Sequence, residues 1–360
     1  MEQMINVVFC MDSNYTQHAA AALVSLLMHN KPSELKIFIV SSQISKEDSG
    51  RLKAVADRFN TEFDFRYLDK KTLPKLKKHL HMTEATYYRL LLPELLTEIN
   101  KVIYLDSDTL IETNLHELWN TDLENFGVAG YDEEKDFQTQ RLDLEPDFYI
   151  NAGILVINLS FWRENSISLK CFDWLKKNPD KNLLLDQDAI NSVLKFKKTR
   201  IGLKWNLGPA SFEDRKILEN YPERILHFGA PIKPWHKCYD FDLQDLYRKY
   251  ISYTPWKNLF KPAEPCNVAQ ASLVANQYYY KNNFYEACLY YNQAIQFRIQ
   301  VKLLESKLLL EVINGGHRHF NNYDFFSACE HYRACMEFWG YPLTYDLDIY
   351  KIPGIVENMF

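Results

Sequence analysis

Residues 102–109 read V-I-Y-L-D-S-D-T. The apolar run from Val102 to Leu105 predicts a buried strand, and two carboxylates, Asp106 and Asp108, follow it with one small residue between them. Like charges this close repel each other, so a pair at the end of a buried strand needs a physical reason. A divalent cation is the usual one, because Mg²⁺ and Mn²⁺ prefer oxygen ligands and Mg²⁺ sites combine carboxylates with substrate phosphates. The alternative is a solvated turn, the commoner setting of an Asp-x-Asp triplet.

Strand and helix patterns alternate around this stretch. Strands are predicted at Ile5–Cys10, Leu35–Val40, Glu62–Leu68 and Lys101–Leu105. Helices are predicted at Thr16–Met28, at Lys46–Phe59 with Ser45 as N-cap, and at Thr83–Leu96 with a break at Pro93 near its end. This alternation predicts a mostly parallel sheet, in which ligands bind outside the carboxyl ends of the strands. Asp12 and the carboxylate pair both follow strands, so both are expected at that edge.

Length and composition limit the class of protein. A chain of 360 residues is long for one core and sufficient for two. A net charge of −5 argues against a general nucleic-acid binder, which would carry a basic face. Seven cysteines without a C-x-x-C pair read as reduced thiols. No stretch approaches the ~18–20 apolar residues of a membrane span, so a cytoplasmic protein is expected, with membrane contact only from the surface of the inner membrane.

The composition changes near residue 255. Three prolines, Pro255, Pro262 and Pro265, predict a linker at 255–268 between a domain at 1–254 and a helical region at 269–340, with a tail at 341–360. In the helical region a spacing of 41 residues relates three pairs of positions: Phe284 and Phe325, Ala287 and Ala328, Tyr291 and Tyr332.

These helical patterns resemble tetratricopeptide helix pairs, whose period is about 34, with an extended helix through 301–313 accounting for the longer spacing. A generic helical tail is the alternative. Its many Tyr and Phe residues predict either helix-packing core or a surface for a protein partner, an acceptor or a membrane interface.

Six blocks, in order over about residues 5 to 240, resemble glycosyltransferase family 8, which includes bacterial lipopolysaccharide galactosyl- and glucosyltransferases and the glycogenins. They are F-C-M-D-S-N-Y (9–15), T-Y-Y-R-L-L-L-P-E (86–94), V-I-Y-L-D-S-D-T-L (102–110), Y-I-N-A-G-I-L-V-I-N-L (149–159), L-D-Q-D-A-I-N (185–191) and H-F-G-A-P-I-K-P-W-H (227–236). One departure is that Ala230 stands where the family usually has glycine, three residues after the motif histidine, and Gly229 precedes it.

The resemblance implies an α/β, Rossmann-like fold of the GT-A type, with a mixed sheet flanked by helices and a small all-α C-terminal domain. It implies retaining transfer of galactose or glucose from UDP-galactose or UDP-glucose to a hydroxyl of a glycan, a lipid-linked glycan or a glycoprotein. Asp106, Asp108 and His227 then resemble the protein ligands of Mn²⁺ or Mg²⁺. A lone histidine at a strand end would otherwise be interpreted as a structural residue.

The resemblance also implies a donor site. Asp12, Asn14 and Tyr15 resemble the uridine-binding residues, although D-S-N alone is equally a turn, and Ser107 is expected near the ribose. Arg89, Asn151 and Asp186 resemble residues that hold sugar hydroxyls, although Asn151 and Asp186 also suit helix or strand ends. The remaining donor residues are Gly153, Gly229 and Lys233, the last of them against the diphosphate.

Catalysis is expected at Gln187, with Asp186 and Lys233 beside it. An amide is a poor nucleophile, so front-face attack is expected, with a β-phosphate oxygen accepting the proton of the acceptor hydroxyl. The polar stretch 131–148 is predicted to be a loop over the acceptor. Two other classes stay open: a degenerate transferase fold that recruits a partner through its helical tail, and a metal-dependent nucleotidyltransferase or phosphohydrolase.

Overall fold

The structure is a computed structural model, which describes residues 4–69, 84–133, 136–208, 215–229, 233–237, 239, 241–300 and 307–339. The chain forms two compact units: one comprises Met1–Pro231 and Tyr247–Phe260, the other Ile232–Leu246 and Lys261–Phe360. The predicted domain limits at 254 and 268 stay a proposal. The predicted tail at 341–360 and the position of Ala230 lie outside the described residues.

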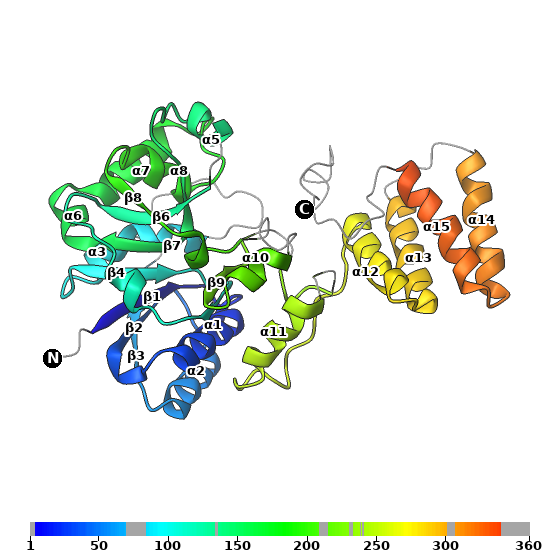
Figure 1. The fold of residues 1–360 in the computed structure, drawn as a ribbon, viewed down its shortest axis with the longest axis horizontal. Coiled ribbons are helices and arrows are strands. Elements are labelled where there is room, and N and C mark those ends of the chain that lie inside the picture. The colour runs from blue at the N-terminus through cyan, green and yellow to red at the C-terminus, as the bar shows by residue number, and fades with distance from the viewer. Residues whose placement is uncertain are drawn as a thin grey trace. The chain divides into compact units, whose positions relative to one another are not determined.

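A seven-stranded sheet forms the centre of the first unit (Figure 1). Its strands are β1 (Ile5–Cys10), β2 (Leu35–Ser41), β3 (Phe63–Tyr67), β4 (Lys101–Leu105), β6 (Val128–Asp132), β7 (Ile150–Asn158) and β8 (Lys198–Ile201). The order is β3-β2-β1-β4-β7-β6-β8. Only β7 is reversed, because it runs antiparallel to both β4 and β6 while the other pairs are parallel. The four predicted strands are confirmed, and the sheet is mixed.

Helices cover both faces of this sheet. In the first unit they are α1 (Thr16–His29), α2 (Lys46–Arg58), α3 (Leu92–Leu95), α4 (His116–Trp119), α5 (Asp136–Arg141), α6 (Leu159–Glu164), α7 (Ile167–Lys177), α8 (Asp186–Val193) and α10 (Arg215–Asn220). Figure 1 shows α1 and α2 on one side of the sheet and α6, α7 and α8 on the other. The Ser45 hydroxyl accepts the backbone N–H of Asp48 at 3.0 Å, so the predicted N-cap of α2 is confirmed.

Two local predictions were wrong in detail. The segment expected as one α-helix is instead a 3₁₀ helix, η3 (Glu84–Leu91), followed by the single turn α3. The predicted break near Pro93 is confirmed, because the helix type changes at Leu92 and Pro93 lies in the first turn of α3, where its missing N–H costs nothing. The stretch 131–148 is not all loop, because it holds the end of β6 and the helix α5.

A second, two-stranded sheet follows the carboxylate pair directly. It joins β5 (Thr109–Glu112) to β9 (Arg224–His227), with Thr109 opposite His227 in antiparallel register. The single-turn 3₁₀ helix η4 (Leu203–Trp205) leads into a segment bonded to β9, since the N–H of Leu207 donates to Ile225. Another 3₁₀ turn, η1 (Pro32–Glu34), precedes β2. The small sheet brings residues more than one hundred positions apart to the end of β4.

The described part of the second unit includes two helix pairs, α12 (Val268–Tyr280) with α13 (Phe284–Gln300) and α14 (Lys307–Asn321) with α15 (Phe325–Phe338). The helix α11 (Phe241–Ile251) begins in this unit and ends in the first. Ala287, Tyr291, Ala328 and Tyr332 are buried in one core, so the helix-packing interpretation is confirmed for these positions. Of the extended helix expected through 301–313, residues 307–313 lie in α14, and residues 301–306 lie outside the described residues.

The 41-residue spacing has a structural counterpart at two cysteines. Cys288 in α13 and Cys329 in α15 occupy equivalent positions, and their Sγ atoms lie 3.1 Å apart. Each thiol also lies near the carbonyl that begins the other helix, Phe325 or Phe284. Within the described residues, no helix has both the length and the apolar character needed to cross a membrane.

Candidate active site

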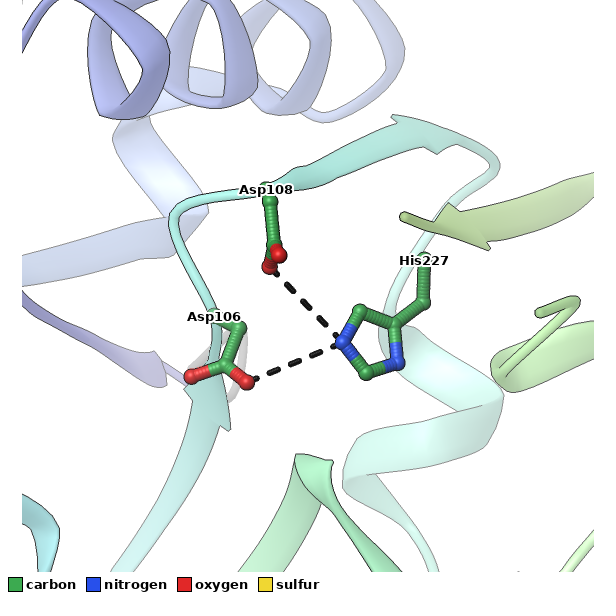
Figure 2. A group of neighbouring side chains, drawn as sticks. All are labelled: Asp106, Asp108 and His227. Carbon is green, nitrogen blue, oxygen red and sulfur yellow. Dashed lines mark ion pairs between the residues drawn. The ribbon is translucent and has the colours of Figure 1, made fainter. Parts of the chain in front are cut away.

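The two carboxylates and one imidazole converge at the end of β4 (Figure 2). Asp106 follows β4 and Asp108 precedes β5, so the chain turns between them. Nε2 of His227 lies 3.7 Å from Oδ2 of Asp106 and 3.7 Å from Oδ1 of Asp108. The side chains of Asp106, Asp108 and His227 are 24%, 10% and 6% exposed. Three ligand atoms therefore share one partly buried point.

Backbone pairing places the histidine. The register of β5 against β9 puts His227 opposite Thr109, and the N–H of Phe228 donates to the carbonyl of Asp108 at 2.9 Å. On its other side the N–H of His227 donates to Leu207 at 2.9 Å. The position of the imidazole is thus set by main-chain hydrogen bonds on two sides.

This donor set fits a divalent metal ion. The candidate ligand atoms all lie within 4.8 Å of one another, a separation that one ion can bridge. Carboxylate oxygens suit Mg²⁺ and Mn²⁺, and an imidazole nitrogen suits transition ions. Among the described residues, this is the only group of three or more Asp, Glu, His or Cys side chains that could hold a metal ion. The predicted ligand set is therefore brought together as expected.

Two glycines make room for the imidazole. A Cβ at Gly153 would lie 2.2 Å from Cε1 of His227, and one at Gly229 would lie 3.0 Å from the same atom. Real Cβ contacts are essentially never shorter than 3.0 Å. Gly153, predicted as a donor-site residue, thus has a second role in the structure, because only glycine lets β7 approach this ring.

Arg89 connects the metal site to α8. Its Nη2 donates to Oδ1 of Asp106 at 2.9 Å, and its Nε lies 2.9 Å from Oδ2 of Asp186. Its Nη1 donates to the carbonyl of Ala152. Burial opposes the charge on Arg89, but Asp106 and Asp186 hold its pKa above the usual value. The role of Arg89 in fixing Asp106 was not predicted, and a sugar contact stays a prediction.

Asp186 is buried in the same ion-pair network. Burial raises the pKa of its carboxyl to about 6, although Arg89 and the hydrogen bond from Thr86 act in the opposite direction. The N-cap interpretation of Asp186 was wrong, because Asp186 is the first residue of α8 and its carboxylate faces Thr86 and Arg89. Asp188 instead accepts the N–H groups of Leu183 and Leu184.

The tripeptide Asn151-Ala152-Gly153 at the start of β7 connects α8 to the candidate metal site. The N–H of Ala152 donates to Oε1 of Gln187 at 2.8 Å, and the carbonyl of Gly153 accepts the N–H of Asp106 at 2.8 Å. Asn151 donates to Glu133 at 3.0 Å. Gln187 also donates to the hydroxyl of Tyr149 at 3.1 Å, so its amide is held by protein groups on both ends. Glu133, which lies within the polar stretch, was not predicted as a site residue.

The predicted nucleotide residues lie at the same sheet edge. Oδ1 of Asp12 accepts the N–H groups of Asn14 and Tyr15, so the turn interpretation is confirmed for this oxygen. Burial raises the pKa of the Tyr15 phenol, and the charges of Asp108, Asp106 and Asp12 raise it further. The Ser107 hydroxyl donates to the carbonyl of Cys10, joining the ends of β4 and β1.

Lys233 is buried and belongs to the second unit. Its N–H donates to Nδ1 of His236 at 3.3 Å. Its predicted contact with a diphosphate stays a prediction.

An α/β sheet with an Asp-x-Asp-His cluster at its carboxyl edge is the arrangement of GT-A-type glycosyltransferases. The family model "Glycosyl transferase family 8" matches residues 6–238. The chain therefore belongs to glycosyltransferase family 8.

Named relatives agree with this assignment. General stress protein A of Bacillus subtilis is 28% identical over 282 residues, which is 73% of this chain and 98% of that protein. The lipopolysaccharide 1,3-galactosyltransferase of Salmonella typhimurium is 25% identical over 268 residues, 70% of this chain and 79% of that protein. The lipopolysaccharide 1,2-glucosyltransferase of Escherichia coli is 26% identical over 278 residues, 71% and 80%.

Solved structures show the same fold. Galactosyltransferase LgtC, in a complex with donor and acceptor sugar analogues, matches with a TM-score of 0.64 at 22% identity and covers 71% of this chain and 99% of that chain. Glycosyltransferase GlyE of Streptococcus pneumoniae TIGR4 matches with a TM-score of 0.53 at 23% identity, covering 78% and 64%. The predicted fold class is confirmed.

Proposed function

We propose that this protein transfers galactose or glucose, with retention of anomeric configuration, from UDP-galactose or UDP-glucose to a hydroxyl of a glycan or glycoconjugate. The cluster of Asp106, Asp108 and His227 carries the proposal, because these three side chains could hold a divalent ion at the edge of the sheet where ligands bind in such folds. Relatives named as lipopolysaccharide glucosyl- and galactosyltransferases support a lipopolysaccharide-like glycan acceptor, and another lipid-linked glycan or a glycoprotein is the alternative. We also propose a cytoplasmic location with contact at the inner membrane surface.

The ligand set favours Mn²⁺, with Mg²⁺ as the alternative, because an imidazole suits Mn²⁺ better. When bound, such an ion neutralises the charge that develops on the departing UDP. Asp106 and Asp108 would hold it through oxygen and His227 through Nε2, while Arg89 keeps Asp106 in place. Tyr15, whose backbone N–H is bonded to Asp12 at the same sheet edge, is proposed to stack its ring on the uracil base. Lys233 is proposed to contact the diphosphate, while Asn14, Ser107 and Gly229 line the donor.

Gln187 is proposed to lie beside the anomeric carbon, with Asp186 and Asn151 orienting the hexose hydroxyls. The hydrogen bonds from Ala152 and to Tyr149 hold the Gln187 amide in one orientation. A fixed, neutral amide oxygen can stabilise an oxocarbenium-like centre without forming a covalent intermediate. Front-face attack follows from this choice, in which the acceptor hydroxyl enters on the side from which UDP leaves.

A binding module that recruits a partner through the helical unit is the alternative function. The convergence of both carboxylates with His227 argues against it, because a degenerate site has no need to keep like charges 3.7 Å from one imidazole. A nucleotidyltransferase or phosphohydrolase would account for the carboxylates but not for the family match over residues 6–238.

The test is release of UDP from a panel of UDP-sugars, with Mn²⁺ and with a chelator, for wild type, Asp108→Ala and Asp57→Ala. Asp57 lies exposed on α2 and controls for loss of an aspartate. Release from one UDP-hexose that requires Mn²⁺, survives Asp57→Ala and disappears in Asp108→Ala supports the proposal and names the donor. Since an enzyme can wait for its acceptor, the panel is repeated with lipopolysaccharide and disaccharide acceptors. No release in any combination favours the binding module.

A further inference from the structure

A buried side-chain amide lies behind the candidate metal site, beside the Nδ1 edge of His227 that points away from the carboxylates. Asn206 follows η4, is 3% exposed, and its Oδ1 lies 2.9 Å from Nδ1 of His227. The next residue, Leu207, makes two hydrogen bonds to the β9 backbone, since its N–H donates to Ile225 and its carbonyl accepts from His227. Asn206 is therefore held in register with the histidine by main-chain hydrogen bonds.

The hydrogen bonds around Asn206 form a chain in which only one assignment of donors and acceptors works. The N–H of Gly153 can only donate, so the atom of Asn151 that it meets at 2.8 Å is an acceptor, Oδ1. The same Oδ1 faces Asn206 at 3.0 Å, so Asn206 presents its NH₂ group there. Asn206 consequently turns its own oxygen toward His227, and that oxygen requires a proton on Nδ1.

A neutral imidazole carries a proton on one nitrogen only, so a proton on Nδ1 leaves Nε2 with a free lone pair. Asp106 and Asp108 favour the other tautomer, Nε2–H, because both carboxylates would attract a proton on Nε2. The distances decide between the two: 2.9 Å to Asn206 is a hydrogen bond, whereas 3.7 Å to either carboxylate is not.

We propose that Asn206 is a positioning residue that selects the Nδ1–H tautomer of His227, anchored through Asn151 on the backbone N–H of Gly153. The lone pair of Nε2 is then directed at the point between Asp106 and Asp108 before any metal ion arrives. This inference rests on the proposed function for its purpose, metal binding, but the tautomer itself is a property of the metal-free protein. Partners of this kind behind a ligating histidine typically change metal affinity 10–100-fold when they are removed.

Two substitutions at Asn206 distinguish the effect of its acceptor oxygen from the effect of its NH₂ group. Asn206→Leu removes the oxygen that receives the Nδ1 proton, whereas Asn206→Asp keeps an oxygen there, and both remove the NH₂ group. Asn30→Leu is the matched control for loss of a buried amide, because Asn30 is 7% exposed, makes three side-chain hydrogen bonds to the backbone and lies at the end of α1.

The experiment is nitrogen-15 NMR of histidine-labelled, metal-free protein at mildly alkaline pH, with His227→Gln used to assign the His227 signals. We expect Nδ1 of His227 to be protonated in wild type, in Asn206→Asp and in Asn30→Leu, and the Nε2–H form to appear in Asn206→Leu. Titration with Mn²⁺ alone, followed by the loss of the free-ion electron paramagnetic resonance signal, should show about 10–100-fold weaker binding for Asn206→Leu and a smaller loss for Asn206→Asp.

A wild-type His227 protonated on Nε2 would overturn the inference. So would loss of Nδ1 protonation in a folded Asn206→Asp, which also decides the matter if Asn206→Leu does not fold. Because the NMR result needs neither metal nor sugar nucleotide, it stays informative if the protein transfers no sugar, and failure of the two proposals can be distinguished.

Discussion

Gly153→Ala tests how tightly β7 fits against the metal site. The new Cβ would lie 2.2 Å from Cε1 and 2.5 Å from Nε2 of His227, where ordinary contact begins at 3.4 Å. The imidazole must therefore retreat by about 1.2 Å, the difference between 3.4 and 2.2 Å. It is 6% exposed and held by Asn206, so it has little room in which to move without leaving the carboxylates. A misplacement of about 1 Å can cost on the order of 100-fold in rate.

We expect Gly153→Ala to bind Mn²⁺ at least about tenfold more weakly and to release UDP about 100-fold more slowly, while it stays folded. Gly202→Ala is the matched control, because Gly202 has φ −70° and a Cβ there meets nothing within 4 Å. Calorimetric Mn²⁺ titration and UDP release measure the two effects. Wild-type Mn²⁺ affinity in Gly153→Ala would refute the close approach described for β7 and His227.

Four further predictions concern stability and the chemical step. Gly50→Ala, at an exposed position of α2 with open space around it, should raise the free energy of unfolding by about 0.5–1 kcal/mol. Gly316→Ala in α14 should instead lower it by about 1–3 kcal/mol, because its Cβ would lie 2.4 Å from the buried ring of Tyr332; denaturant melts should show opposite signs. Burial and the charge of Lys233 lower the pKa of His236 from 6.5 to about 4. Between these pH values the unfolded chain therefore binds a proton at His236 that the folded chain does not bind. Between pH 6.5 and pH 4, the free energy of unfolding of wild type should therefore fall by about 3 kcal/mol more than that of His236→Gln. Parallel curves of unfolding free energy against pH for the two proteins would contradict this. Gln187→Ala should reduce kcat while donor affinity stays near wild type, and collapse of donor binding would assign Gln187 a different role.

The carboxylate pair was predictable because its signal is local. An apolar run predicts the strand, and Asp106 and Asp108 follow it within three residues. His227 needed the family resemblance, since no pattern near residue 227 indicates that β9 pairs with β5. The pairing of strands distant in sequence is a tertiary event, and single-sequence periodicity does not report it.

The residues that support the ligands were missed for the same reason. Asn206 lies in the sequence K-W-N-L, which carries no metal-ligand spacing, and its role exists only because η4 is placed against β9. For Arg89 only a sugar contact was predicted, so its hydrogen bonds to Asp106, Ala152 and Thr86 were not foreseen. The reversal of β7 was equally hidden, because an apolar strand reads the same in either direction.

The most direct test of the proposed metal-dependent donor site is calorimetric binding of UDP with and without Mn²⁺, for wild type, Asp108→Asn and the exposed control Asp57→Asn. We expect UDP to bind to wild type and to Asp57→Asn only when Mn²⁺ is present, and Asp108→Asn to lose this binding even with the metal. UDP that binds equally well with a chelator, or equally well to Asp108→Asn, would contradict the claim that Asp106, Asp108 and His227 hold a metal ion for the donor.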